Sequence, residues 1–290
     1  MNASARAHAF DISVIIPCYN RVEFLRQALL SVSKQSLCPT EIIVIDDGSV
    51  THLEKKLASE FPHTLWYRQQ NQGVSSARNL GIQKAQCPWV AFLDSDDEWK
   101  PEKLEKQIRF HKSHPTILAS HTDEVWVRNG NQVLPPKYLN KAPEQLFKRS
   151  LERCLICPSS VLLHHSIFEK FGCFDKNLPV CEDYDLWVRI LLKESFGYID
   201  EKLVVKHGGH SDQLSRQNWG MDRFRVKSLE KLVEKGEIPS GKQEAILSIL
   251  VQKCKILSKG FRKHNKDKQS EMYLQQSFKY HNLLHTLHRD

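Results

Sequence analysis

The stretch AFLDSDDEW, residues 91–99, places four acidic side chains directly after an apolar run, with no lysine or arginine between them. Like charges this close repel each other, so a cation is expected there. An Asp-x-Asp pair such as Asp94 and Asp96 suits a hard divalent ion, because Mg²⁺ and Mn²⁺ prefer oxygen ligands and share them with substrate phosphates. The alternative is that Asp96 or Asp97 only caps a following helix.

A second carboxylate pair, Asp46 and Asp47, stands in EIIVIDDGS. A carboxylate there can accept hydrogen bonds from a base N–H or a ribose hydroxyl, although Asp-Gly-Ser is also a common turn sequence. Neither acidic site carries a Gly-x-Gly-x-x-Gly or Gly-x-x-x-x-Gly-Lys-Ser loop. Dinucleotide oxidoreductases and phosphate-loop NTPases are therefore disfavoured, and a nucleotide whose diphosphate is held by a metal remains.

The elements that must position these carboxylates alternate between strand and helix. The pattern predicts buried strands at 12–17, 41–46, 64–69 and 89–94. Helical patterns separate them: an apolar stripe from Phe24 to Val32, residues 51–60 and residues 73–85. This alternation implies a parallel sheet covered on both faces, with ligands at the carboxyl ends of its strands. The polar clusters at 17–20, 46–49 and 94–97 should therefore lie along one edge.

The second half of the chain is mixed. Residues 101–114 and 182–193 look helical, a hairpin is expected around Asn129–Gly130, and 157–165 is a candidate strand. From about residue 216 the pattern is helical and basic.

Five stretches resemble the successive motifs of family 2 glycosyltransferases, which are inverting enzymes of GT-A fold. They are SVIIPCYNR, EIIVIDDGS, NQGVSSARNLGI, WVAFLDSDDEW and EDYDLWVRI. The resemblance covers residues 12 to about 215. It implies an α/β, Rossmann-like, mainly parallel sheet with helices on both faces in residues 1–215. Residues 216–290 would form a basic helical C-terminal extension.

The resemblance further implies transfer of a sugar from a nucleotide-sugar, usually a UDP-sugar, with Mn²⁺ or Mg²⁺. The donor-binding residues are expected to be Pro17, Tyr19, Asn20, Asp46, Asp47, Arg78, Asp94 and Ser95. Tyr19 would lie near the base, and Arg78 would approach the nucleoside or diphosphate. Asp94, Asp96 and a loop histidine would hold the metal; His210 is the first choice and His207 the second.

A single inverting displacement needs a carboxylate that takes a proton from the acceptor hydroxyl, a contribution of ~10²–10⁴-fold, and a cation that neutralises the leaving diphosphate. The resemblance makes Asp183 the base. Glu182 is the rival; the two residues point about 100° apart on a helix and cannot share one role. Asp185 is a third candidate. Stabilisation of a helix N-terminus is the alternative for all three.

Composition sets further bounds on the 290-residue chain, whose net charge is +8. No apolar run reaches the ~20 residues that span a bilayer, and the start MNASARAHAF lacks a secretory signal core. We expect a cytoplasmic protein, with its basic end docked peripherally on the inner face of the membrane. The acceptor would be a glycan or lipid-linked, in polysaccharide biosynthesis. No nucleic-acid module is evident.

Two alternatives remain open from the sequence. The first is a non-catalytic nucleotide-sugar-binding or scaffold protein of the same fold. The second is a structural zinc at Cys154 and Cys157, which lacks a second tight pair of ligands. Eight scattered cysteines are better explained as free thiols.

Overall fold

The computed structural model describes residues 9–136, 139–141, 144–209 and 219–287. Its strands are β1 (Ile12–Cys18), β2 (Glu41–Asp46), β3 (Thr64–Arg68), β4 (Trp89–Phe92), β5 (Asp97–Trp99), β6 (Ala119–Arg128), β7 (Asn131–Val133), β8 (Val161–His164) and β9 (Gly197–Gly208). Its α-helices are α1 (Val22–Ser33), α2 (Leu53–Leu57), α3 (Val74–Lys84), α4 (Lys103–Ser113), α5 (Leu146–Glu152), α6 (Ser166–Phe171), α7 (Glu182–Leu191), α9 (Asp222–Lys235), α10 (Ser240–Lys263) and α11 (Asp267–Leu287).

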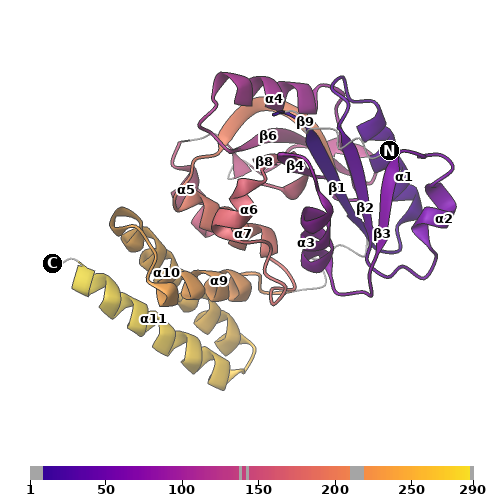
Figure 1. Cartoon of the computed structure of the whole chain (residues 1–290). Coiled ribbons are helices and arrows are strands. Elements are labelled where there is room, and N and C mark those ends of the chain that lie inside the picture. The colour runs from indigo at the N-terminus through magenta and orange to yellow at the C-terminus, as the bar shows by residue number, and fades with distance from the viewer. Residues whose placement is uncertain (1–8, 137–138, 142–143, 210–218, 288–290) are drawn as a thin grey trace.

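The strands form one sheet in the order β3-β2-β1-β4-β8-β6-β9-β5, with β7 paired to β6 (Figure 1). The first four strands are parallel, as the strand–helix alternation predicts. Beyond β4 the sheet becomes mixed, because β8 runs antiparallel to both β4 and β6 while β9 is parallel to β6. The predicted Rossmann-like α/β sheet is thus confirmed, and antiparallel pairing is added in its second half.

Helices cover both faces of the sheet, because successive side chains of a buried strand point to opposite sides. Ile15 packs in one core with residues of α3, α6 and α7. Its neighbours Val14 and Ile16 pack in a second core with residues of α1, α2 and α4. The inner strands β1, β2 and β4 are therefore mostly apolar, which explains the β-branched runs in the sequence, whereas the edge strand β3 is partly exposed.

Helix α3 lies unusually close to β1 because Gly81 has no side chain. A Cβ atom built on Gly81 would come 2.3 Å from Cγ2 of Ile15, which is fully buried. A glycine in a helix interior costs ~0.5–1 kcal/mol relative to alanine. Close packing against the strand is the physical reason for accepting that cost, and it fixes the position of Arg78, one turn earlier in α3.

A capping box formed by Asn20 and Glu23 would be the natural start for α1 in this sequence, but the structure does not contain it. The helix begins at Val22, and the residue before it makes no side-chain cap. Asn20 is instead left-handed, with φ of 55°. Its side-chain oxygen accepts the N–H of Val50, and its own N–H donates to Ser49. Asn20 therefore ties the loop after β1 to the loop after β2.

Helices α9 and α10 pack against α7 and α5, and α11 packs against the outer side of α10 (Figure 1). Leu151 of α5 and Val188 of α7 share a core with Leu229 of α9 and Leu250 of α10. The helical character expected after residue 216 is present from Asp222 onward. We propose that residues 216–290 are an extension built on the domain formed by residues 1–215, since the two share this core.

Candidate active site

The carboxyl ends of β1, β2 and β4 meet at one edge of the sheet. Parallel β1 lies between the other two strands, with Cys18 opposite Asp46 and Ile15 opposite Phe92. The polar clusters that follow these strands are consequently neighbours, although β4 ends two residues earlier than expected. Pro17 is buried inside β1. Tyr19, just beyond it, is 46% exposed and leaves an aromatic face available at the edge.

The carboxylates of Asp46 and Asp47 are both buried and hold the loops around them. Asp46 accepts the Ser49 N–H at 2.8 Å and pairs with Arg68 at 2.8 Å. Asp47 accepts the amide of Gln69 at 2.6 Å, and it also accepts the N–H groups of residues 72 and 73 at 3.0 and 2.9 Å. These carboxylates thus shape the edge through turn chemistry, the alternative that the sequence left open.

Arg78 links the sheet edge to the start of α7. Its Nη2 donates to Asp94 at 2.6 Å and its Nη1 donates to Glu182 at 2.7 Å. The side chain is 4% exposed, and its Cζ lies 5.2 Å from the ring centre of Phe174. Burial opposes the charge of Arg78, but the two carboxylates outweigh it and raise the pKa above the usual value. Arg78 thus bridges two acids, and its predicted approach to the donor stays a prediction.

The acidic cluster after β4 is held by partners of different kinds. The side chains of Asp94 and Asp96 are 27% and 16% exposed, and Asp96 pairs with Arg21 at 2.8 Å. Asp97 is buried; it accepts the Ser159 hydroxyl at 2.7 Å and belongs to β5. Burial, followed by the charge of Asp96, raises the pKa of Asp97 well above its usual value. No helix starts here, since α4 begins at Lys103, so the helix-cap alternative is wrong. Ser95 is also buried.

Asp94 and Asp96 supply the oxygen donors that a hard cation requires. Within the residues that the structure describes, no set of three histidine, cysteine or carboxylate side chains is placed to hold a metal. His210 lies outside the described residues. The second choice, His207, contacts Glu98 through its ring Nε2 at 2.8 Å. The backbone N–H of His207 donates to Asp97 at 3.2 Å. The chemistry of the donor set fits Mn²⁺ or Mg²⁺, and the oxygen of Asp96 that pairs with Arg21 is Oδ2.

The three acids at the start of α7 have different surroundings. Glu182 is buried and bound to Arg78. Asp185 is buried and joins α7 to α9, because it accepts hydrogen bonds from Arg189 at 2.9 Å and Ser228 at 2.7 Å. Asp183 is only half-buried and accepts the thiol of Cys154 at 3.3 Å. Of the three, Asp183 is the least buried carboxylate.

The cysteine pair serves the acids rather than a zinc ion. All eight cysteines lie in the described ranges and none is in a disulfide. Cys154 donates to Asp183, while Cys157 donates to Glu124 at 2.9 Å. Burial raises the pKa of Cys157 to about 12, so its thiol remains a donor at neutral pH. The zinc alternative finds no support among the described residues.

Ser159 is a residue of this site that the sequence did not reveal. Its hydroxyl accepts the Asp94 N–H at 3.1 Å and donates to Asp97, and its carbonyl accepts the indole N–H of Trp99 at 2.7 Å. The segment 154–159 thereby connects the base candidate Asp183 to the acidic loop. A serine in such a segment has no local pattern that announces this role.

Glu182 gives the site a predicted pH signature. Burial, and then the nearby charge of Asp183, raise the pKa of Glu182 from 4.5 to about 7, although Arg78 opposes the rise. The folded protein therefore holds a proton that the unfolded chain has already released in this range. Stability from this proton is complete below pH 4.5 and is lost as the pH rises to about 7.

We expect the unfolding free energy of the wild type to fall between pH 4.5 and 7 relative to that of Glu182→Gln, whose amide oxygen can still accept from Arg78. Urea unfolding of both proteins across this range measures the difference. Glu169→Gln, at a carboxylate that is 75% exposed, is the control. Parallel curves for wild type and Glu182→Gln would contradict this prediction.

Comparisons with known proteins agree with the geometry. Residues 13–172 match the family model described as glycosyl transferase family 2. An uncharacterized glycosyltransferase of Rickettsia felis is 31% identical over 225 residues, which are 76% of this chain and 37% of that protein. The putative teichuronic acid biosynthesis glycosyltransferase TuaG of Bacillus subtilis is 28% identical over 76% of this chain and 89% of its own length. The chain thus spans little more than a third of the first of these relatives.

Among solved structures, S. aureus TarS 1–349 in complex with UDP-GlcNAc superimposes with a TM-score of 0.64 and 16% identity. The match covers 91% of this chain and 90% of that one. A second structure of the same fragment, in complex with UDP, has a TM-score of 0.60. At this identity the likeness establishes the fold, which is GT-A.

Proposed function

The chain belongs to glycosyl transferase family 2, and from this premise we propose that it is a metal-dependent inverting glycosyltransferase using a UDP-sugar. The observation that carries the proposal is the Arg78 bridge. One buried guanidinium pairs with both Asp94, at the edge proposed for the donor, and Glu182. Glu182 is the sequence neighbour of Asp183. A donor held at the edge and an acceptor hydroxyl at Asp183 would therefore meet across a short distance.

In the proposed reaction, Asp183 accepts the proton of the acceptor hydroxyl as its oxygen attacks the anomeric carbon. The bond from that carbon to the diphosphate breaks in the same step, and the configuration inverts. Cys154 orients the carboxylate of Asp183, and Arg78 fixes Glu182 beside it. When bound by Asp94 and Asp96, Mn²⁺ or Mg²⁺ would supply positive charge for the leaving diphosphate.

The choice of UDP is supported by the structural neighbours, whose complexes contain UDP-GlcNAc and UDP. Exposed Tyr19 can stack on a base, and the loop fixed by Asp47 can line the nucleoside pocket. An N-acetylhexosamine is accordingly the first donor sugar to test. The name of TuaG supports a place in polysaccharide biosynthesis.

A screen of nucleotide-sugars tests this function. With Mn²⁺ present, a UDP-sugar should raise the melting temperature and be slowly hydrolysed, and its GDP, ADP and CMP counterparts should do neither. No stabilisation by any UDP compound would refute the proposal. If a UDP-sugar stabilises the protein but is neither hydrolysed nor transferred to any glycan acceptor, the result would favour the non-catalytic binding protein.

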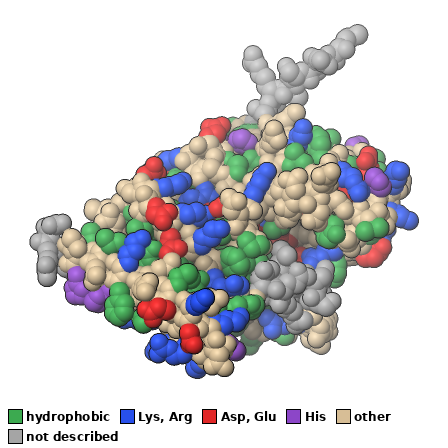
Figure 2. Space-filling model, turned by 90° about the horizontal axis from the view of Figure 1, so that it is seen from below, with side chains coloured by type: hydrophobic (Ala, Val, Ile, Leu, Met, Phe, Trp, Pro, Cys, Tyr) green, Lys and Arg blue, Asp and Glu red, His purple; other side chains and the backbone are tan. Residues whose placement is uncertain are grey.

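Peripheral membrane docking of the C-terminal helices is a further part of the proposal. In the described part of the chain, no helix is long and apolar enough to cross a membrane. Figure 2 shows lysine and arginine side chains spread among acidic ones on the face that includes these helices. An interspersed surface binds anionic lipid more weakly than a clustered one. Flotation with phosphatidylglycerol vesicles at low salt should recover the protein, and failure to float would reject docking.

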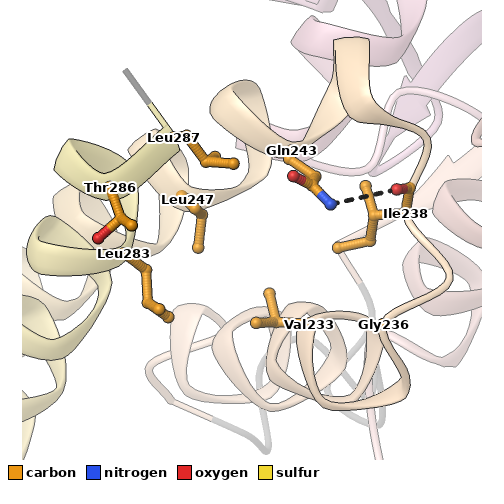
Figure 3. Close-up of a pocket in the computed structure, with 8 residues that line it drawn as sticks. All are labelled: Val233, Gly236, Ile238, Gln243, Leu247, Leu283, Thr286 and Leu287. Carbon is orange, nitrogen blue, oxygen red and sulfur yellow. Dashed lines mark hydrogen bonds between the residues drawn. The ribbon is translucent and has the colours of Figure 1, made fainter. Parts of the chain in front are cut away.

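An apolar cavity of about 230 Å³ lies among α9, α10 and α11 (Figure 3). Its lining includes Val233, Leu247 and Leu283, and Gln243 at its rim donates to the carbonyl of Ile238 at 3.4 Å. None of the predicted donor, metal or base residues lines it. We therefore assign the transfer reaction to the sheet edge.

A further inference from the structure

Strands β6, β9 and β5 form a platform that extends the sheet edge beyond the acidic loop. Strand β6 pairs with β8 only through residue 121, and its remaining residues run on beside β9. In this register Trp126 lies opposite Lys206, and Lys206 lies opposite Asp97 of β5. The three residues therefore sit side by side next to Asp94.

Glu124 is the carboxylate at the centre of this platform. It is 4% exposed, its Oε2 lies 2.6 Å from Nζ of Lys141, and its Oε1 accepts the indole N–H of Trp126 at 2.6 Å. It also accepts the thiol of Cys157. Burial opposes its charge, but Lys141 and then Lys206 overcome this and lower the pKa of Glu124 to about 2. Glu124 is thus ionised, and its oxygens are already occupied by donors.

Lys206 is a cation of the platform without a direct partner. Its charge is retained although burial opposes it, because Glu124, Cys157, Asp97 and Asp94 raise the pKa well above its usual value. Within the part of the chain that the structure describes, its Nζ makes no hydrogen bond and no ion pair. It lies near the ring of Trp126, whose centre is 5.9 Å from Nζ.

A second cation lies beside the same ring. Arg128, exposed at the end of β6, adds a further cation 5.5 Å from the centre of the same Trp126 ring. Lys141 is paired with Glu124, so Lys206 and Arg128 are the two cations left beside the Trp126 ring. Half-buried Trp126 is fixed by its bond to Glu124 and forms a rigid wall beside the cations.

The position of Lys206, Arg128 and Trp126 relative to the proposed base indicates that they lie on the acceptor side of the site. Segment 154–159 contacts Asp183 through Cys154, Glu124 through Cys157, and Asp94 and Asp97 through Ser159. The platform consequently lies along the path that joins the acidic loop to Asp183. The donor diphosphate, in contrast, is assigned to Asp94 and Asp96.

We propose that Lys206 and Arg128, beside the wall formed by Trp126, bind an acidic group of the acceptor glycan, either a carboxylate or a phosphate. The inference rests on the proposed function, and it adds that the acceptor is an anionic glycan. A charge-assisted hydrogen bond to a half-buried lysine is strong enough to set a preference of about tenfold or more over a neutral analogue.

Binding of small probes to the UDP-saturated protein tests this subsite by isothermal titration calorimetry. The probes are methyl β-glucuronide, glycerol 3-phosphate and neutral methyl β-glucoside. The wild type should bind one or both acidic probes at least about tenfold more tightly than the glucoside. The two acidic probes distinguish a carboxylate from a phosphate. Lys206→Gln should abolish the preference, and Arg128→Gln should weaken it. Lys202→Gln, exposed on the same strand, should leave it unchanged.

Each outcome has a separate meaning. Equal binding of charged and neutral probes by the wild type would overturn the proposal, as would a preference that survives in both Lys206→Gln and Arg128→Gln. Weakened UDP binding in Lys206→Gln with intact probe binding would assign the lysine to the donor instead and overturn it too. If Lys206→Gln does not fold, Arg128→Gln decides, because its side chain is exposed. A wild type that binds no UDP contradicts the proposed function itself.

Discussion

Turnover of Asp183→Asn is expected to fall by about 10²–10⁴-fold while donor binding is retained. The amide has the shape of the carboxylate and can still accept the Cys154 thiol, but it cannot take a proton from the acceptor hydroxyl. Asp183 is also the least buried of the acids at the start of α7. Steady-state transfer rates and UDP affinity, measured on the same preparation, separate the two effects.

Two variants control this experiment. Asp200→Asn removes an exposed aspartate of β9 and should leave the rate unchanged. Glu182→Gln should reduce the rate less than Asp183→Asn, because Glu182 is buried against Arg78 and acts by positioning. Wild-type turnover in Asp183→Asn would show that Asp183 is not the base. A loss of turnover confined to Glu182→Gln would make Glu182 the base instead.

Arg78→Met is expected to destabilise the protein by about 3–5 kcal/mol, the effect of removing one partner from a buried ion network. Asp94 and Glu182 would be left without their common cation, and Glu182 would remain buried beside Asp183. Methionine retains an unbranched stem and removes the guanidinium, so the loss reports mainly on the missing cation. Urea unfolding at pH 7 measures it.

Arg109→Met is the matched control. Arg109 also pairs with a glutamate, Glu105, on a helix, but its side chain is 71% exposed. An exposed pair of this kind contributes ~0.3–0.5 kcal/mol. A similar small loss in Arg78→Met would contradict the bridge, and the link between the donor edge and α7 would have to be found elsewhere.

The parallel half of the fold follows from local sequence. Strands that are buried on both faces are apolar at most positions, so 12–17 and 41–46 could be recognised and their ends placed together. The twelve-residue strand β9 could not be predicted in this way. Much of its surface is partly exposed and its partner β6 is far away in sequence, so only the assembled sheet defines it.

The residues of the site likewise include some that the sequence predicts and some that it does not. Asp46, Asp47, Asp94 and Asp96 stand at strand ends, which makes their common edge predictable from topology alone. The partners of these acids could not be predicted, since Arg78 reaches Glu182 across 104 positions of sequence. The buried cations around Glu124 were missed for the same reason. Charge pairing between distant segments leaves no periodic pattern.

Calorimetric titration of UDP into the protein, with Mn²⁺ and with chelator, tests the central claim that the acidic edge binds the donor through a divalent ion. Binding should be at least about tenfold tighter with Mn²⁺, and Asp96→Ala should lose this dependence while remaining folded. Equal UDP affinity with Mn²⁺ and with chelator, or a full metal effect in Asp96→Ala, would contradict the account.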